Sequence, residues 1–339
     1  MPEKTIRSEI EVKKTTSEIT FKNKLDHFLA RWGWRRSSHL VEPGIYAVGD
    51  PGADSPVLVT ANYTLSFDAL RSALAGTDAY ILVLDTKGIN VWCAAGKGTF
   101  GTDELVSRIE QTGLADVVET RKLTLPQLGA SGVSGYKVKE RSGFKVEFGP
   151  IRAEDVPEYL RLGKATDEMR RMRFPLKDRV VLIPVELVNA TIPVAAGTLA
   201  MMLLDGTTGG IGMAASSIAG LVLFPIKLPY LPGREFSLKG FVLGGLTALP
   251  FAVFAFLKGN GGPGRRALHA LSYMLIFPST TSFLALNFTG STPIASKSGV
   301  EDEIYKWIPV MAWTAGAGAT IAIGLGIDRL RRSEKTWRR

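Results

Sequence analysis

Hydrophobic positions are distributed very differently in the two halves of the chain. Up to about residue 178, apolar residues come in short runs between polar and charged ones. Beyond it, five apolar stretches follow one another, at about 180–204, 211–226, 238–257, 267–288 and 307–327. Four of them reach the roughly 20 residues that cross a bilayer, and they lack the polar face that a core helix of a soluble protein keeps. The pattern predicts an α/β part followed by an all-α transmembrane domain.

The number of membrane crossings depends on the second stretch, 211–226, which is short and ends in a Pro-containing segment, so that it can cross or re-enter. Basic residues favour the cytoplasmic side of a membrane. Four crossings place both the N-terminal half and the arginine-rich C-terminus in the cytoplasm, whereas five place that C-terminus outside. The charge pattern alone favours four.

Short apolar runs in the N-terminal half alternate with amphipathic segments. Runs 56–60 and 79–85 are rich in β-branched residues and nearly continuously apolar, as in strands covered on both faces. Segment 66–74 between them has helical spacing, with Ser66 as its N-cap and Gly76 as its terminator. Together they predict a βαβ unit in a mostly parallel, Rossmann-like sheet.

The same patterns predict further elements of this α/β domain. A helix capped by Thr102 is expected from Asp103 to Thr112, a third strand at 116–119 and a last helix at 153–162. Weaker strand patterns lie at 136–138 and 145–148. The expected organisation is an α/β domain at 1–163, a basic linker at 164–178, a transmembrane domain of about five helices at 179–328 and a basic tail at 329–339.

The net charge of +9 could indicate a nucleic-acid partner. The basic residues, however, flank the apolar spans, where they suit membrane orientation and anionic lipid, so nucleic-acid binding is not expected. Residues 1–24 are polar and carry no secretory signal, so the α/β domain is expected in the cytoplasm, on a multi-pass protein of the cytoplasmic membrane.

Ligands of parallel α/β sheets lie beyond the carboxyl ends of the strands. Loops 60–65, 85–93 and 123–130 are expected at that edge. None of them carries a GxGxxG fingerprint or a Walker loop, which disfavours a nucleotide-binding domain.

Cys93 is the only cysteine, so the chain has no internal disulfide and no cluster held by several of its own cysteines. A lone cysteine is most often a small buried hydrophobe. Cys93, however, follows a strand and a glycine turn. It precedes Ala94, Ala95 and Gly96, which leave room for a large flat ligand, and Lys97, which favours a thiolate. Two interpretations remain open: a core residue, or a soft ligand for a soft metal that another scaffold holds.

The segment NVWCAAGKGTF at 90–100 resembles the cap-helix signature of the HgcA family, the membrane-anchored corrinoid proteins of bacterial and archaeal mercury methylation. The segments TANYTLSFD at 60–68 and LTLPQLGA at 123–130 extend the resemblance, as does the membrane half, which has five helices in that family. The N-terminal part is also similar to the corrinoid-binding domain of the corrinoid iron–sulfur protein of the acetyl-CoA pathway, which has no membrane domain.

The resemblance implies a cobalamin-type corrinoid bound with its own base displaced, and Cys93 as both the catalytic residue and the lower axial ligand of cobalt. It also implies a corrinoid-dependent methyltransferase that moves a methyl group from cobalt to mercury(II), giving methylmercury. A thiolate ligand suits this transfer because it donates electron density to the metal. The implied partners are a ferredoxin-like protein with two [4Fe-4S] clusters as reductant and mercury carrier, a methyltetrahydrofolate-dependent methyl donor, mercury(II) and membrane lipid.

By the same resemblance, the corrinoid is expected to contact residues of the three loops. They are Thr60, Asn62, Tyr63, Leu65 and Ser66 in the first; Asn90, Val91, Trp92, Cys93, Ala94, Ala95, Gly96 and Lys97 in the second; and Leu123, Pro126, Gln127, Gly129 and Ala130 in the third. Ordinary turn chemistry is the alternative for these Asn, Gly and Pro residues, and Trp92 can equally be a core residue.

Two other functions remain open. One is a corrinoid methyl carrier of one-carbon metabolism, of the acetyl-CoA pathway type. The other is a membrane transporter or receptor with a cytoplasmic sensor domain, which would bind no cobalamin and give Cys93 no role.

Overall fold

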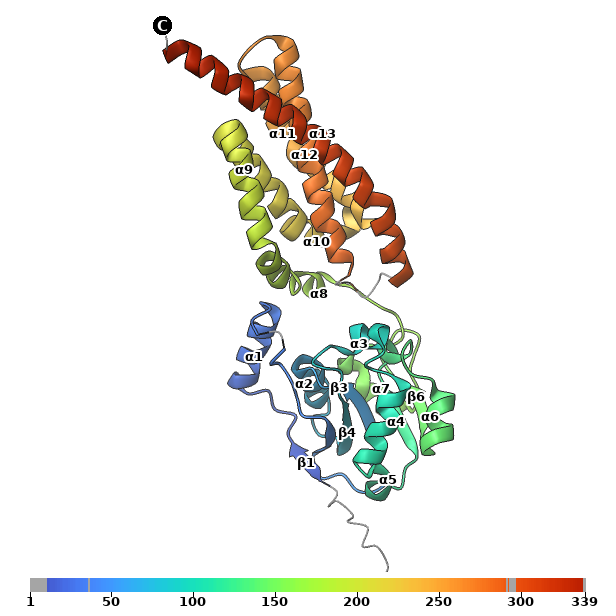
Figure 1. The fold of residues 1–339 in the computed structure, drawn as a ribbon. Coiled ribbons are helices and arrows are strands. Elements are labelled where there is room, and N and C mark those ends of the chain that lie inside the picture. The colour runs from blue at the N-terminus through green and yellow to red at the C-terminus, as the bar shows by residue number, and fades with distance from the viewer. Residues whose placement is uncertain (1–10, 36, 291, 293–296, 338–339) are drawn as a thin grey trace, which may run out of the picture. The chain divides into compact units, whose positions relative to one another are not determined.

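The chain forms two compact units, Met1–Arg173 and Phe174–Arg339 (Figure 1). The structure is a computed structural model that describes residues 11–35, 37–290, 292 and 297–337. The boundary between the units lies inside the segment expected as a linker. Each unit is described by itself.

The first unit is built on a six-stranded mixed sheet, which confirms the expected α/β fold class. The strands are β1 (Val12–Thr15), β2 (Gly44–Val48), β3 (Val57–Ala61), β4 (Ala79–Leu84), β5 (Lys122–Leu125) and β6 (Lys145–Phe148). Their order is β1-β2-β4-β3-β5-β6. Only the β2–β4 pairing is antiparallel, and the expected βαβ unit is the parallel pair of β3 and β4 joined by α2 (Thr64–Ala73).

Helices cover both faces of the sheet because its central strands are apolar on both sides. Side chains alternate along β3: Val57 and Val59 pack on one face and Leu58 on the other. The face of Leu58 is covered by α2 and α7 (Val156–Leu162), which follows the short turn η2 (Ala153–Asp155). The opposite face is covered by α3 (Val91–Lys97), α4 (Thr102–Gln111), α5 (Leu114–Val117) and α6 (Gly135–Ser142).

Two expected strands are wrong. Segment 116–119 contains the end of α5, and 136–138 lies inside α6, whose start is capped by the Ser134 hydroxyl and whose end is followed by Gly143 in the left-handed conformation (φ 75°). The strand after β4 is β5 instead, which overlaps the start of segment 123–130, expected to be a loop.

Two expected caps are also wrong. The helix expected from Ser66 begins at Thr64, and Thr102 is the first residue of α4, so neither Ser66 nor Thr102 caps a helix. The strand at 145–148 is confirmed as β6.

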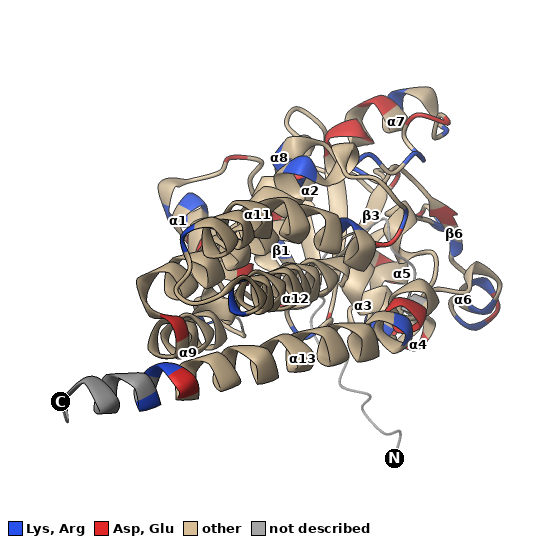
Figure 2. Cartoon of the chain, turned by 90° about the horizontal axis from the view of Figure 1, so that it is seen from above, with Lys and Arg blue, Asp and Glu red and all other residues tan. Residues whose placement is uncertain are grey.

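The second unit is helical and contains four helices, among the described residues, that are long and apolar enough to cross a membrane. Its elements are α8 (Leu176–Val180), α9 (Ile183–Ile218), the π-helical turn η3 (Ala219–Leu223), α10 (Phe224–Lys227), η4 (Leu228–Tyr230), α11 (Phe236–Lys258), α12 (Pro263–Thr289) and α13 (Lys297–Trp337). Lys, Arg, Asp and Glu are absent from the long middle part of α13 (Figure 2).

The first two apolar stretches are joined in α9, and the chain reverses between them at Gly206. Gly206 has φ 74° and ψ −163°, which are not helical angles. Residues on either side of it pack together: a Cβ built on Gly209 would lie 2.8 Å from the carbonyl oxygen of Met201. Two straight arms of one helix could not meet in this way, so α9 is a helical hairpin.

The second arm of this hairpin runs beside α12 over most of the arm's length. The Asp205 carboxylate at the reversal is 2.7 Å from the His269 ring, the Thr281 hydroxyl donates to the Ser216 carbonyl, and the ring of Phe224 packs against that of Phe288. Stretch 211–226 therefore covers the same depth as α12, which is long enough to span a bilayer.

Candidate site at the carboxyl edge of the sheet

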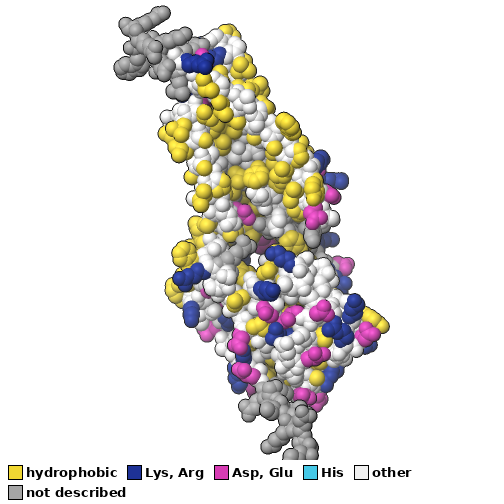
Figure 3. All heavy atoms as spheres, in the orientation of Figure 1, with side chains coloured by type: hydrophobic (Ala, Val, Ile, Leu, Met, Phe, Trp, Pro, Cys, Tyr) yellow, Lys and Arg dark blue, Asp and Glu magenta, His cyan; other side chains and the backbone are white. Residues whose placement is uncertain are grey.

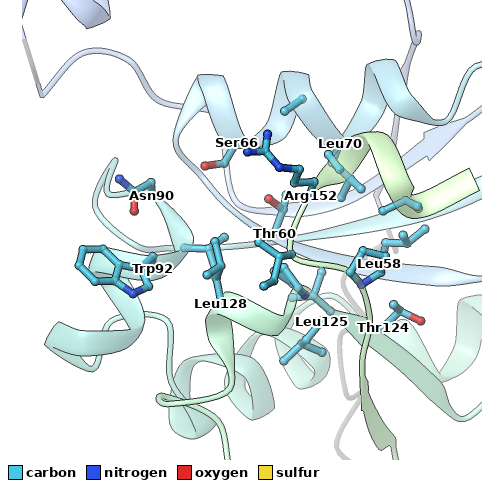
Figure 4. Close-up of a pocket in the computed structure, with 18 of the residues that line it drawn as sticks. Leu58, Thr60, Ser66, Leu70, Asn90, Trp92, Thr124, Leu125, Leu128 and Arg152 are labelled. Carbon is cyan, nitrogen blue, oxygen red and sulfur yellow. The ribbon is translucent and has the colours of Figure 1, made fainter. Parts of the chain in front are cut away.

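A cavity of about 340 Å³ lies beyond the carboxyl ends of β3, β4, β5 and β6 (Figure 4). Its lining is mostly apolar. The lining residues are Leu58, Val59, Thr60, Tyr63, Leu65, Ser66, Ala69, Leu70, Asn90, Val91, Trp92, Thr124, Leu125, Pro126, Leu128, Pro150, Ile151, Arg152, Ala153 and Val156.

The topology of the sheet explains why the cavity is there. From β3 the chain passes through α2 to β4 on one side, and then crosses back to β5 on the other side of β3. The connections that leave β3 and β5 diverge at this point, which opens a crevice at the carboxyl ends of the strands.

The segment 90–97 forms the expected short helix, α3, beside this cavity. Asn90 caps it, because its side-chain Oδ1 accepts a hydrogen bond of 3.0 Å from the backbone N–H of Cys93. The helix ends at Gly98, which has φ 83°. Asn90 and Trp92 both lie at the cavity (Figure 4), so Trp92 is not a fully buried core residue.

The two faces of α3 have different surroundings. Val91, Ala94 and Ala95 are buried in the core of the unit. Cys93 is partly exposed and its thiol is free, while Gly96 is exposed and a Cβ built on it would meet nothing within 4 Å. The small residues Ala94 and Ala95 therefore serve packing, whereas Gly96 leaves open space on the same side of the helix as Cys93.

The third loop and the residues that follow it, up to Gly132, explain why small residues are needed beneath α3. A Cβ built on Gly129 would lie 2.5 Å from the Phe100 ring, and one built on Gly132 would lie 2.2 Å from the Phe100 carbonyl oxygen and 3.0 Å from the Ala95 Cα. Only glycine permits the loop to approach the cap helix this closely.

The turn between β4 and α3 is held by Asn62. Its buried side chain accepts hydrogen bonds from the backbone N–H groups of Thr86 and Gly88, both 3.0 Å, and donates to the Asp85 carboxylate. Asn62 therefore positions the loop that leads to α3 and does not line the cavity.

The polar groups at the cavity are few. The hydroxyls of Thr60 and Ser66 make no hydrogen bond to any part of the chain that the structure describes, and both residues lie at the cavity with Arg152 (Figure 4). They can therefore bond to polar groups on the rim of a ligand whose body packs on the apolar lining.

The structure brings some of the expected contact residues to the cavity and places others beside it. Thr60, Tyr63, Leu65, Ser66, Asn90, Val91, Trp92 and Pro126 line it. Asn62, Cys93, Ala94, Ala95, Gly96, Lys97, Leu123, Gln127, Gly129 and Ala130 do not; of these, Leu123 is fully buried in the core.

A fourth connection at the cavity, not predicted from the sequence, consists of Pro150, Ile151 and Arg152, which follow β6. The signal was available, since a parallel strand followed by Gly149 and Pro150 presents its loop at the same edge of the sheet. Within the described residues, no group of three or more His, Cys, Asp or Glu side chains could hold a metal ion.

The fold and this edge site define an α/β domain with a cavity at the carboxyl edge of its sheet, in a chain whose second unit has four long apolar helices among the described residues. Comparison with known proteins shows what this domain is similar to. Residues 34–160 match the family described as CO dehydrogenase/acetyl-CoA synthase delta subunit.

Curated relatives match the same region. The chain is 38% identical over 127 residues to the acetyl-CoA decarbonylase/synthase complex subunit gamma of Methanopyrus kandleri, covering 37% of this chain and 27% of the relative. It is 25% identical over 150 residues to the corrinoid/iron-sulfur protein large subunit of Moorella thermoacetica, covering 42% of this chain and 33% of the relative.

The matching region spans about a third or less of the length of these relatives. These matches show that the N-terminal unit is a distant homologue of a domain found in corrinoid/iron-sulfur proteins. In this chain that domain is followed by a unit whose described residues include four long apolar helices, which indicates a multi-pass membrane segment.

Proposed function

We propose that the first unit binds a cobalamin-type corrinoid at the carboxyl edge of its sheet, with Cys93 as the lower ligand of cobalt, and that the protein transfers a methyl group to mercury(II). The observation that carries the proposal is a partly exposed lone thiol on a short capped helix beside this cavity, within a region homologous to corrinoid proteins. The resemblance of segment 90–100 to the cap helix of the mercury-methylating family supports the choice of acceptor.

The residues present fit one side of a corrinoid. The cavity volume of about 340 Å³ is near the lower end of the roughly 300–1,000 Å³ of small-molecule sites. A macrocycle larger than a drug molecule would therefore be covered on one side only. The apolar lining suits its flat body, and Thr60, Ser66 and Arg152 can bond to the amide side chains on its rim.

The chain's own residues would act in three ways. Asn90 fixes the start of α3 and so the position of Cys93. Gly96 leaves the outward side of α3 open for close approach. Cys93, as a thiolate, would supply a soft donor to the metal. When bound, the corrinoid would supply a cobalt ion that accepts and releases a methyl group.

The proposal also assigns partners and a location. Since the chain has one cysteine, electrons must come from another protein, for which we propose a ferredoxin-like partner with two [4Fe-4S] clusters that also delivers mercury(II). The methyl group would come from a methyltetrahydrofolate-dependent donor. We place the first unit in the cytoplasm and the helical unit in the cytoplasmic membrane.

The test uses the full chain, loaded with cobalamin in detergent under anaerobic, reducing conditions and mixed with the ferredoxin-like partner, a methyl donor and mercury(II). The expected result is methylmercury from the natural chain and none from Cys93→Ala, because the thiolate ligand is lost. The visible spectrum of bound cobalamin should change in the same variant. Tyr136→Ser, which alters an exposed side chain of α6, is the control and should retain both properties.

The outcomes separate the alternatives. An unchanged cobalamin spectrum in Cys93→Ala refutes the axial ligand. A changed spectrum without methylmercury from the natural chain supports the corrinoid methyl carrier of one-carbon metabolism, to which the relatives belong. Failure to bind cobalamin at all refutes both and leaves the sensor-domain function.

A further inference from the structure

Helix α1 (Phe21–Arg31) has an unusual distribution of side chains. Large apolar residues are exposed at Phe21, Leu25, Phe28 and Trp32, with Phe21 82% exposed. At the roughly 100° per residue of an α-helix, these four positions lie within about 60° of one another. They form one continuous stripe, which we call the α1 stripe.

The opposite side of α1 is polar and faces the domain. His27 Nε2 lies 2.7 Å from the Asp68 carboxylate of α2. Asp26 lies 2.7 Å from the ring of the buried His39 and accepts a hydrogen bond of 2.7 Å from the Thr64 hydroxyl. An ordinary surface helix turns its apolar face to the core and its polar face to water. In α1 this arrangement is reversed.

Specific hydrogen bonds hold α1 in this reversed orientation. Thr20 and Asn23 form a capping box at the start of the helix, and Arg71 donates hydrogen bonds to the backbone carbonyls of Thr16 and Glu18 in the segment before it. The α1 stripe is therefore not an accident of a loosely attached terminus, because specific polar contacts hold it outward.

Basic residues accompany the α1 stripe. Lys22 lies on one side of it and Lys24 and Arg31 on the other, all exposed. Arg35 and the exposed Trp34 follow the helix. Segment 21–35 holds four basic residues and one acidic residue, Asp26, whose carboxylate is already engaged by His39 and Thr64. Figure 3 shows hydrophobic and basic side chains side by side over α1.

We propose that α1 is an interfacial membrane helix, whose stripe enters the surface of an anionic phospholipid bilayer. Phe, Leu and Trp on one face with flanking Lys and Arg are the composition of helices that lie in the headgroup region, where basic side chains reach lipid phosphates. The same chain supplies a reason for a bilayer to be near α1, because its described residues include four apolar helices long enough to span one.

This contact would orient the cavity at the carboxyl edge of the sheet. Asp26 and His27 of α1 make hydrogen bonds with residues of α2. Helix α2 begins directly after Tyr63, which lines the cavity. Docking α1 on the bilayer would therefore set the angle between the cavity and the membrane surface. The membrane docking itself does not depend on which ligand the cavity holds.

The test places an environment-sensitive fluorophore on the α1 stripe of the full chain. In a Cys93→Ser background, Phe28→Cys is labelled with a nitrobenzoxadiazole dye, and the matched control is Tyr136→Cys, an exposed aromatic position on α6. Both proteins are placed in nanodiscs of phosphatidylglycerol and phosphatidylcholine, with or without lipids that carry a spin-label quencher on the upper acyl chain. The emission of label 28 should shift to the blue and lose most of its intensity with the quencher, while label 136 should change little.

A second pair of samples tests the role of charge. In nanodiscs of phosphatidylcholine alone, or after Lys22→Gln and Lys24→Gln, quenching of label 28 should fall severalfold, because attraction to anionic lipid is lost. If label 28 is quenched no more than label 136 in anionic nanodiscs, the proposal is wrong. A blue shift without lipid quenching that grows with protein concentration would instead assign the α1 stripe to a second copy of the chain, and would also overturn it.

Discussion

Helices α1 and α3 belong to the same unit, yet they are attached to it by opposite kinds of surface. On α1 the inward side is polar, with Asp26 and His27 engaged in short hydrogen bonds, while large apolar side chains face outward. On α3 the inward side is apolar and small, with Ala94 and Ala95 in the core. The attachment of α1 should therefore respond to charge and pH, and that of α3 to side-chain volume.

The largest change in backbone hydrogen exchange is expected when the polar contacts that attach α1 are broken. Asp68 is buried and accepts hydrogen bonds from His27 and from Arg71, which is itself only 5% exposed. Removing one member of a buried ion pair costs about 3–5 kcal/mol, because the other charge stays buried without a counter-charge. In Asp68→Ala, backbone amides of α1 should exchange hydrogen far faster by mass spectrometry. Glu154→Ala, which removes an exposed surface pair, should leave α1 unchanged.

The same contact gives α1 a dependence on pH. Burial by itself would raise the pKa of Asp68, but hydrogen bonds from His27 and Arg71 outweigh it and hold the pKa below its ordinary value of 3.8. Because the folded pKa is the lower one, the contact stabilises fully above about pH 4 and is lost as pH falls toward the folded pKa. Protection of α1 should therefore drop in acid while that of α3 does not. Parallel loss in both helices would contradict the contrast between them.

The second prediction concerns the volume beneath α3. In Gly132→Ala the new Cβ would meet the Phe100 carbonyl oxygen and the Ala95 Cα, which are backbone atoms that cannot turn aside. Overpacking of this kind costs about 1–3 kcal/mol. Amide exchange in 91–97 should speed up, and cobalamin binding should weaken because Cys93 is displaced. Gly52→Ala, where a Cβ would meet nothing within 4 Å, is the matched control. Equal behaviour of the two variants would mean that the close approach of Gly132 does not determine the position of α3.

Much of the fold could be predicted from the sequence where a pattern had a single explanation. The continuous apolar runs of β3 and β4 and the helical spacing of α2 and α4 gave the core of the sheet and its parallel pairing. Segment 136–138 was predicted as a strand because alternating apolar and polar residues fit a strand as well as a helix over so short a length. Ser134 and Gly143 mark the two ends of the helix that forms there. Helix α1 was not predicted, although Phe21, Leu25, Phe28 and Trp32 have the spacing of an amphipathic helix. That spacing alone would predict a stripe packed on the core, whereas the structure exposes it.

The site was predicted as far as the rule for parallel sheets reaches. The rule gave three of the four connections at the cavity, and the resemblance to the cap-helix signature gave α3, but neither gave the use of each small residue. Ala94, Ala95, Gly96 and Gly129 look alike in the sequence. Only their neighbours show that Gly129 makes room for Phe100 while Gly96 makes room for nothing in the chain.

The third prediction concerns a substitution that weakens the start of α3 and leaves the packing of the helix unchanged. Asn90 satisfies the backbone N–H of Cys93, and loss of such a cap costs about 1 kcal/mol. In Asn90→Ala, amides of 93–95 should exchange several times faster, in line with a factor of roughly 5 for this energy. Asn90→Ser, whose hydroxyl can replace the cap, should restore protection. If Asn90→Ser restores protection but not cobalamin binding, Asn90 also contacts the ligand, as its position at the cavity allows.

The smallest change in stability is expected at Gly96, where a substitution should stabilise α3 and not weaken it. Its outward position is open, so Gly96→Ala should meet nothing and should stabilise α3 by about 0.5–1 kcal/mol, because alanine loses less backbone freedom than glycine on folding. Amide exchange in α3 should therefore slow slightly. Gly98→Ala, only two residues away and equally open, should do the reverse, because its φ of 83° is strained for any side chain.

The Gly96 position then separates stability from ligand binding. Gly96→Leu should keep α3 folded, since its side chain points into open space, but should exclude a large flat ligand from the neighbourhood of Cys93. Titration of the full chain with cobalamin, followed by its visible spectrum, should show binding lost in Gly96→Leu and largely kept in Gly96→Ala. Unimpaired binding in Gly96→Leu would place the corrinoid on another side of α3. In that case α3 would not bury one face for packing and present the other to the cofactor.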